Sequence, residues 1–234
     1  MITPEQVAEN LEYVRGAIAQ AAGRAGRDAQ DVTLIAVSKT VPLDLVRIAY
    51  NLGVTNFGEN RVQDALPKIA EFSPPDARWH MIGHLQSNKV SKVIGAFASV
   101  ESVDNLHLAQ ALERHAAKQG VTLPVLLQVN VSGEASKEGM SPAEVLEMAR
   151  QIVVLPNLRV EGLMTIAPIA QNQEETRPVF RQLRLLRDHL RNEIPQSNWR
   201  HLSMGMTDDY RVAIEEGATI VRIGRAIFGE RVYS

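Results

Sequence analysis

The sequence predicts an α/β fold of the (β/α)8 TIM barrel class, preceded by one extra N-terminal helix. Eight short apolar segments alternate with helical stretches along 234 residues, no Ser/Gly-rich linker interrupts them, and the length suits one barrel core. We therefore expect a single domain over residues 1–234. An open doubly wound sheet shares this alternation, but no Gly-x-Gly-x-x-Gly turn follows the first expected strand.

The extra helix is expected to begin at Pro4. Thr3 can cap it, Gln6 completes a capping box, and proline suits the first helical position. Apolar residues follow at helical spacing: Val7, Leu11, Val14 and Ile18.

The eight expected strands are largely apolar, as parallel strands covered by helices tend to be. They span residues 32–39, 56–60, 78–83, 97–104, 124–131, 158–167, 201–205 and 220–224. Between them, helices are expected near Pro42, Asp104, Glu174 and Thr207. A second capping box, Ser-Pro-Ala-Glu at residues 141–144, predicts another helix start.

Composition narrows the class of ligand. Lys and Arg number 25 and Asp and Glu number 27, so a net charge of −2 gives no electrostatic case for a nucleic-acid or anionic-membrane binder. The chain has no cysteine, which excludes disulfides and thiolate metal sites. Neither a signal peptide nor a long apolar run is visible, so we expect a cytoplasmic protein with a small-molecule ligand.

Barrel active sites lie at the carboxyl ends of the strands, where Lys39 closes the first strand. Its alternation with Ile35 and Val37 places it on the same strand face as two branched apolar side chains. Desolvation disfavours an ammonium and makes an amine nucleophilic toward carbonyls, so Lys39 is a Schiff-base candidate. The alternative is a lysine that reaches solvent or pairs with Glu59.

Glycine turns close the last two strands, at Gly205 and Gly224. In barrels, the loops after strands seven and eight often bind phosphate through backbone N–H groups. Ser203 can add a hydroxyl donor and Arg225 a positive charge. The alternative is that the two glycines only make tight turns.

A reactive lysine opposite a phosphate site suggests a phosphorylated aldehyde held as an imine. Pyridoxal 5′-phosphate is the leading candidate, and a phosphosugar substrate of a Schiff-base aldolase is the rival. Arg222 shares a strand face with Gly224 and is therefore expected to point into the mouth. An arginine facing a pyridine nitrogen donates a hydrogen bond to it and keeps it unprotonated.

Six motifs resemble those of the pyridoxal phosphate homeostasis proteins, a family of alanine-racemase-like barrels. They are Ala-Val-Ser-Lys at 36–39, Phe-Gly-Glu-Asn at 57–60, Trp-His-Met-Ile-Gly-His-Leu-Gln-Ser-Asn-Lys at 79–89, Gly-Leu-Met at 162–164, Ser-Met-Gly-Met-Thr-Asp-Asp-Tyr at 203–210 and Val-Arg-Ile-Gly-Arg-Ala-Ile-Phe-Gly at 221–229. They span most of the chain in order. Thr207 stands where the family pattern has Ser, which keeps the hydroxyl.

The resemblance implies a barrel of PLP fold type III with pyridoxal phosphate as its cofactor. It implies a Schiff base on Lys39 and a contact from Arg222 to the pyridine nitrogen. The implied phosphate contacts are Ser203, Gly205, Gly224 and Arg225. Three further residues lie in family motifs near the mouth and count as cofactor-binding candidates without an assigned role: Asn60, His84 and Met164.

The resemblance also implies a role in vitamin B6 and amino-acid balance without an established catalytic activity. Racemases of this fold take a tyrosine base from a second, β-rich domain, and only residues 230–234 follow the last barrel turn here. We therefore expect no catalytic turnover, unless Tyr210 or another barrel residue replaces that base. The alternatives are a weak amino-acid racemase, a Schiff-base aldolase, or a regulatory module that binds a partner protein. PLP-dependent apoenzymes are the expected recipients of a delivered cofactor.

Two other signals favour structural interpretations. His80 and His84 are four residues apart on a predicted strand and loop, which is not the helical spacing of a zinc site, so we expect no metal. The Arg-rich segment 181–191 is expected to be the outer face of a helix rather than an RNA or partner surface. Its buried face would carry Leu183, Leu186 and Leu190.

Overall fold

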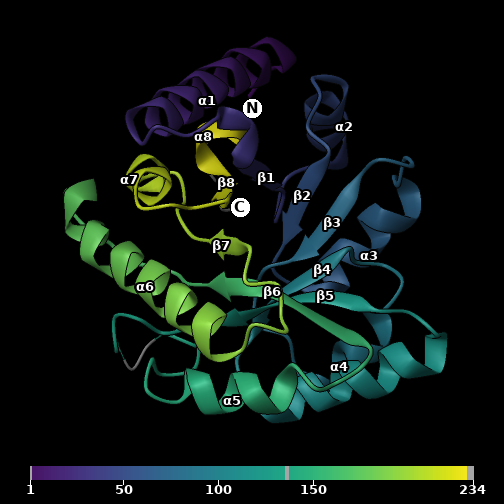
Figure 1. The fold of residues 1–234 in the computed structure, drawn as a ribbon. Coiled ribbons are helices and arrows are strands. Elements are labelled where there is room, and N and C mark those ends of the chain that lie inside the picture. The colour runs from purple at the N-terminus through teal and green to yellow at the C-terminus, as the bar shows by residue number, and fades with distance from the viewer. Residues whose placement is uncertain (1, 135–136, 231–234) are drawn as a thin grey trace.

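The computed structural model describes residues 2–134 and 137–230. Its eight strands close into a parallel barrel in sequence order, which confirms the expected fold class (Figure 1). The strands are β1 Thr33–Val37, β2 Asn56–Glu59, β3 Arg78–Met81, β4 Ser99–Val103, β5 Leu123–Gln128, β6 Leu158–Met164, β7 His201–Ser203 and β8 Ile220–Ile223. Seven lie within the ranges expected from the sequence, and β5 begins one residue earlier.

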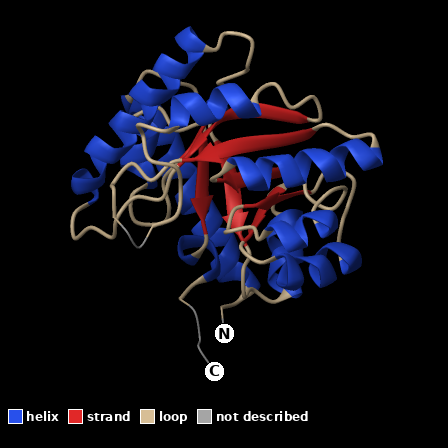
Figure 2. Cartoon of the chain, turned by 90° about the horizontal axis from the view of Figure 1, so that it is seen from below, coloured by secondary structure: helices blue, strands red, loops and turns tan. Residues whose placement is uncertain are grey.

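Helices surround the strands on the outside of the barrel (Figure 2). The α-helices are α1 Pro4–Arg24, α2 Leu43–Asn51, α3 Val62–Glu71, α4 Leu106–Gln119, α5 Val145–Ile152, α6 Arg177–Glu193, α7 Tyr210–Glu215 and α8 Arg225–Phe228. Three short 3-10 helices join them: η1 Ala29–Asp31, η2 Ser87–Lys92 and η3 Gln173–Thr176. The connection from β3 to β4 therefore carries a 3-10 helix where the other barrel units carry an α-helix.

The extra helix α1 begins as the sequence predicts. Thr3 Oγ1 accepts a hydrogen bond from the Gln6 N–H at 3.3 Å, and Gln6 Oε1 accepts one from the Thr3 N–H at 2.9 Å. The helix lies against α7 and α8 (Figure 1). Asn10 donates to the Ile227 carbonyl at 3.0 Å, so α1 is joined to the last βα unit of the barrel.

The expected helix start at residues 141–144 is wrong by three residues. The Ser141 hydroxyl donates to the Glu144 carboxylate at 2.6 Å, and the Glu144 N–H donates to the Ser141 carbonyl at 3.0 Å. Because the hydroxyl is bonded to the carboxylate, only the carboxylate arm of the capping box forms, with the Ser141 N–H at 3.2 Å. A turn precedes the helix, which begins at Val145.

The apolar core has two parts. The larger one fills the space between strands and helices and includes Phe57 and Trp79. The smaller one lies inside the barrel and consists of Ile35, Leu126, Met164 and Ile220, with Ile166 packed against it. Buried polar side chains share the barrel interior with this cluster, among them Ser203 and Arg222.

The Arg-rich segment lies in α6, an amphipathic helix packed on the barrel. Leu183 and Leu190 are fully buried, and Leu186 is half-buried. Three arginines of α6 pair with the carboxylate of Glu216 at the end of α7: Arg177, Arg181 and Arg184. None of the described helices is long and apolar enough to cross a membrane.

Candidate functional site

Lys39 lies two residues beyond the end of β1, at the mouth of the barrel, and its side chain is half-buried. Strand alternation puts it on the face of Ile35, which is fully buried in the barrel interior. The next residue, Thr40, has φ +63°, the only positive φ of a non-glycine residue among those the structure describes. A left-handed conformation costs a β-branched residue about 1–2 kcal/mol, so the chain turns sharply directly after the lysine. The sequence does not predict this turn.

Glu59, which the sequence offers as an alternative partner for Lys39, faces the outer side of the barrel. Its Oε1 accepts hydrogen bonds from Lys68 Nζ at 2.9 Å and from Ser38 Oγ at 2.8 Å. Lys68 Nζ also donates to the Ser38 carbonyl at 2.7 Å. These bonds tie the end of β1 to the end of β2 and to α3, and so support the backbone beside Lys39.

A buried polar layer lies beneath the mouth, formed by Glu101 of β4, Ser203 of β7 and Arg222 of β8. Arg222 Nη1 donates to Ser203 Oγ at 2.6 Å, and Ser203 Oγ donates to Glu101 Oε2 at 2.6 Å. Arg222 Nη2 donates to the Thr165 carbonyl, just after β6, at 2.8 Å. All three side chains of the layer are at most 4% exposed. Arg222 thus occupies the interior position that the sequence predicts. Its link to a carboxylate through Ser203 is not visible in the sequence.

The charges in this layer act on one another. Burial raises the pKa of the Glu101 carboxyl, and Arg222 and the Ser203 hydroxyl oppose that rise. Burial also lowers the pKa of Arg222, while Glu101 and Asp209 act in the opposite direction, and a guanidinium remains charged in proteins. Burial likewise raises the pKa of Asp209, whose Oδ1 accepts from the Met206 N–H at 2.6 Å.

His80 of β3 is also inside the barrel. Its Nε2 lies 3.0 Å from Asn56 Oδ1, which can only accept, and its Nδ1 lies 2.7 Å from Ser99 Oγ. The network therefore assigns the proton to Nε2. Burial lowers the pKa of His80 to about 4, so this histidine is neutral at pH 7 and serves the interior hydrogen bonds.

The two glycine turns lie side by side and next to the end of β1. The Arg222 N–H donates to the Gly205 carbonyl at 3.0 Å, which joins the two turns. A Cβ on Gly224 would lie 3.3 Å from the Val37 carbonyl oxygen. The structure thus brings Lys39, Gly205 and Gly224 to one sector of the mouth.

Gly205 has a local structural reason as well. Its φ is +94°, and a Cβ there would lie 2.6 Å from Ala213 Cβ and 2.9 Å from Tyr210 Cα. The turn interpretation therefore accounts for this glycine without a ligand. At Gly224 the backbone approaches the end of β1 instead.

Two expected phosphate contacts have other partners in the structure. The single hydroxyl proton of Ser203 is donated to Glu101, so it is committed to the buried polar layer. Arg225 is 41% exposed at the rim and pairs with Asp208 and with Glu230 at 3.3 Å. Backbone N–H groups of the two turns, rather than the Ser203 hydroxyl, are thus the donors that remain for an anion.

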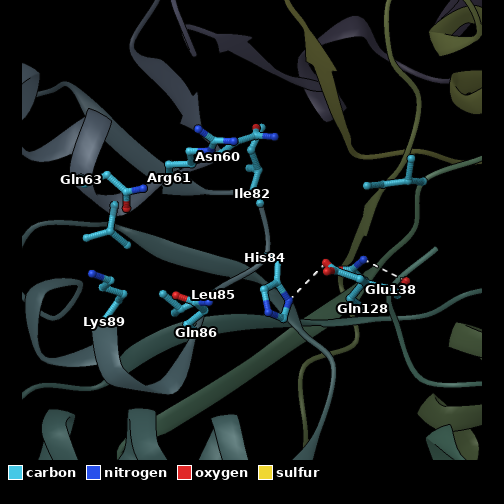
Figure 3. Close-up of a pocket in the computed structure, with 13 residues that line it drawn as sticks. Asn60, Arg61, Gln63, Ile82, His84, Leu85, Gln86, Lys89, Gln128 and Glu138 are labelled. Carbon is cyan, nitrogen blue, oxygen red and sulfur yellow. Dashed lines mark hydrogen bonds and ion pairs between the residues drawn. The ribbon is translucent and has the colours of Figure 1, made fainter. Parts of the chain in front are cut away.

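An open pocket of about 480 Å³ occupies the other side of the mouth, over the ends of β2 and β3 (Figure 3). Asn60, Arg61, His84 and Lys89 are among the residues that line it. Asn60 and His84 therefore belong to the mouth as expected, but they line this pocket and not the sector of the glycine turns. Met164, fully buried in the barrel interior, lies below the mouth.

His84 is close to two carboxylates. Its Nδ1 lies 3.2 Å from Glu138 Oε2 and 3.7 Å from Asp104 Oδ2 (Figure 3 shows the first pair). The three ligand atoms all lie within 4.8 Å of one another, a spacing that could hold a cation. The sequence shows only that His84 lies four residues after His80, a spacing from which no metal is expected. The structure places His84 at the mouth and His80 in the interior.

The sector around Lys39 suits a phosphorylated pyridine aldehyde. It offers an amine at the end of β1, a buried guanidinium beneath the mouth, and two adjoining glycine turns for an anionic tail. The residue that the sequence analysis missed is Glu101, because its partners Ser203 and Arg222 lie across the barrel and more than a hundred residues away in the chain.

Comparisons with known proteins point to one family. The family model described as the alanine racemase N-terminal domain matches residues 8–232. The pyridoxal phosphate homeostasis protein of Aquifex aeolicus is 46% identical over 225 residues, which cover 96% of this chain and 98% of that protein. The protein of the same name from Pseudomonas aeruginosa is 45% identical over 227 residues, covering 97% and 96%.

Solved structures agree with the sequence relatives. PipY of Synechococcus elongatus with PLP bound superposes with a TM-score of 0.84 at 37% identity, over 95% of this chain and all of that one. Alanine racemase of Clostridium difficile superposes with a TM-score of 0.74 at 15% identity, over 97% of this chain and 58% of that one. This second likeness shows a shared barrel fold.

Proposed function

This chain belongs to the family of pyridoxal phosphate homeostasis proteins, and on that premise we propose that it binds pyridoxal 5′-phosphate and acts in PLP and amino-acid homeostasis. We propose further that the cofactor is held as a Schiff base on Lys39 and that the protein has no catalytic turnover of its own. Its task is to store and deliver the cofactor, or to limit the free aldehyde. The proposal includes a cytoplasmic location, which cell fractionation tests.

One observation carries the proposal: Lys39 stands at the mouth within the same sector as Arg222 and the glycine turns at Gly205 and Gly224. An aldehyde, a ring nitrogen and a phosphate need an amine, a donor and an anion site respectively, and the sector supplies all three. The relatives named for PLP homeostasis and the PLP-bound neighbour support the same ligand.

Each residue of the sector has a distinct task in the proposal. The Lys39 amine would hold the aldehyde group of the cofactor covalently, with one water released. Arg222 donates a hydrogen bond toward the ring nitrogen and, as a fixed cation, keeps that nitrogen unprotonated. The backbone N–H groups at the turns, with Arg225 at the rim, hold the phosphate. When bound, the cofactor supplies an electron-withdrawing ring, and this ring withdraws electrons only weakly while its nitrogen is unprotonated.

The position of Tyr210 supports the absence of turnover. Tyr210 is 4% exposed, and the Arg211 guanidinium lies 5.8 Å from its ring centroid and 5.5 Å from that of Tyr13 in α1. The tyrosine therefore packs toward the outer helices. A racemase needs a base on each face of the substrate carbon, and this residue is not placed to be the second one.

Spectroscopy of the purified protein tests the proposal. Mixed with PLP, wild type should show a visible imine band that borohydride bleaches, and Lys39→Ala should lose that band. Lys89→Gln, which changes a lysine on the other side of the mouth, is the matched control and should keep it. A colourless wild type that traps a sugar phosphate would support an aldolase, and turnover of an amino acid by the pure protein would contradict a non-catalytic role.

Delivery is tested separately. Both samples contain a reagent that traps free PLP. The loaded protein should then transfer its cofactor to a PLP-dependent apoenzyme faster than the apoenzyme takes up an equal concentration of free PLP. Equal rates would support a role in limiting the aldehyde. A specific protein complex lost on mutation of the mouth would instead support a regulatory, partner-binding role.

A further inference from the structure

The Ser203 hydroxyl connects a buried carboxylate to a buried guanidinium. It donates its single proton to Glu101 Oε2 at 2.6 Å and therefore can only accept from Arg222 Nη1, also at 2.6 Å. The Arg222 bond can run only in this direction because a guanidinium has no acceptor, and the Ser203 bond runs toward Glu101 when the carboxylate is ionised. A shift of Glu101 would move Ser203 Oγ, which holds Arg222 together with the Thr165 carbonyl at 2.8 Å.

Stability does not explain this arrangement. Glu101 is 1% exposed, and its Oε1 has no hydrogen-bond partner among the described residues. A buried charge pair is often no more stable than apolar side chains of the same volume, and a half-satisfied one is worse. The interior cluster beside it shows that apolar packing is possible inside this barrel. The carboxylate is therefore better explained by what it does to Arg222.

We propose that Glu101 is a positioning residue that, through Ser203, holds the Arg222 guanidinium beneath the ligand and supplies the negative charge that balances it. The inference rests on the proposed function, because the ligand on which it acts is PLP. It adds to that function a residue from the opposite wall of the barrel. Neither a cofactor contact nor a proton transfer is assigned to Glu101 itself.

Other charged groups around Arg222 are otherwise engaged. Asp209, at the start of α7, accepts from the Met206 N–H at 2.6 Å and so holds the loop after β7. His80 Nδ1, on β3, lies 4.0 Å from Glu101 Oε1, and a pKa of about 4 keeps it neutral above pH 5. Lys39, after β1, is the group that the ligand engages. Glu101 is therefore the carboxylate bonded, through Ser203, to Arg222.

An ionised carboxylate beneath the mouth has a measurable effect on a cation above it. It stabilises the protonated form of an imine nitrogen on Lys39 and so raises the pH at which that imine loses its proton. Glu101→Gln keeps the size and an acceptor oxygen for Ser203 but removes the charge. The midpoint of the imine titration should therefore fall, by about one pH unit for one charge in a partly dry site.

The experiment follows the absorption of the PLP-loaded proteins as a function of pH, with the unfolding temperature of each variant beside it. Glu216→Gln is the matched control, because Glu216 is also buried, at 5% exposure against 1% for Glu101, but pairs with arginines of α6. We expect both variants to lose thermal stability and only Glu101→Gln to lower the midpoint. Equal midpoints for Glu101→Gln and wild type, or equal shifts in both variants, would overturn the inference.

Ser203→Ala provides a second route if Glu101→Gln does not fold. It removes the hydroxyl that joins Glu101 to Arg222 while keeping both charges, so the midpoint should move by less than in Glu101→Gln but measurably. A folded Ser203→Ala protein with the wild-type midpoint would overturn the inference by itself. Absence of an imine band in wild type would instead contradict the proposed function, so the two failures are distinguishable.

Discussion

The two sides of the barrel mouth treat charge in opposite ways. In the buried polar layer, Glu101 and Arg222 are joined through Ser203 by bonds of 2.6 Å and are almost inaccessible to solvent. In the open pocket, the described residues include no ion-pair partner for Arg61 or Lys89, and His84 and Glu138, which lie 3.2 Å apart, are 46% and 51% exposed. The layer fixes a geometry beneath the mouth, whereas the pocket leaves its cations to solvent.

This contrast predicts where the protein tolerates change. Removing one member of a buried charge network leaves the others unpaired in a medium of low dielectric constant, whereas exposed charges contribute little to stability. Substitution of a charged side chain should therefore destabilise the protein in the buried polar layer and have little effect in the open pocket. Three predictions test this difference, from the largest expected effect to the smallest.

Arg222→Leu should cost about 3–5 kcal/mol of unfolding free energy, because Glu101 is then buried without its counter-charge. Urea denaturation of the purified proteins measures the loss. Lys89→Gln in the open pocket is the control and should stay within about 0.5 kcal/mol of wild type. Similar losses in the two variants would remove the distinction between the two sides of the mouth.

His80 should make the stability of the protein depend on pH. Its pKa falls from 6.5 to about 4 on folding, so the unfolded chain binds the proton more tightly between these values. This contribution is fully present above pH 6.5 and is lost as the pH falls toward 4, a change of about 3 kcal/mol at about 1.4 kcal/mol per pKa unit.

The measurement is the unfolding free energy from pH 4 to pH 7 for wild type and for His80→Asn. The difference between the two curves isolates this histidine from Glu101 and Asp209, whose raised pKa values act in the opposite direction. A constant difference across the range would show that His80 does not lose its proton affinity on folding.

Gly83→Ala should lower the free energy of unfolding by about 1–3 kcal/mol, because Gly83 packs on the backbone at the end of β2. A Cβ there would lie 2.4 Å from the Asn60 carbonyl oxygen and 2.7 Å from its Cα, so backbone must move. Gly16→Ala is the control: no atom lies within 4 Å of its added Cβ in α1, and the change should stabilise the protein by about 0.5–1 kcal/mol. Thermal denaturation compares the two, and a stabilised Gly83→Ala would show that the pocket wall moves freely.

The sequence predicts the fold well because the signals for it are local. Apolar periodicity and capping residues such as Thr3 involve only residues that are near one another in the chain. The eight strands can therefore be predicted from the alternation of apolar runs with helical stretches. The capping box at Ser141 shows the limit, since a carboxylate and a hydroxyl can bond to each other instead of to the backbone.

The candidate site is predicted only in part, because its energetics depend on contacts across the barrel. Lys39, Gly224 and Arg222 are found from strand ends and alternation. Glu101 is not found, since a single acidic residue in an apolar strand carries no sign of the partner on the opposite wall. Because the sequence does not reveal Glu101, it also predicts the wrong partner for the Ser203 hydroxyl. The sequence suggests a phosphate, whereas in the structure the hydroxyl donates to Glu101.

Mass mapping of the borohydride-reduced, PLP-loaded protein tests the central claim most directly. If Lys39 forms the bond to the cofactor, one peptide containing residue 39 should carry the pyridoxyl phosphate mass, and no other lysine peptide should carry it in comparable yield. A reduced adduct distributed over surface lysines, or found on Lys89 of the open pocket, would contradict the account.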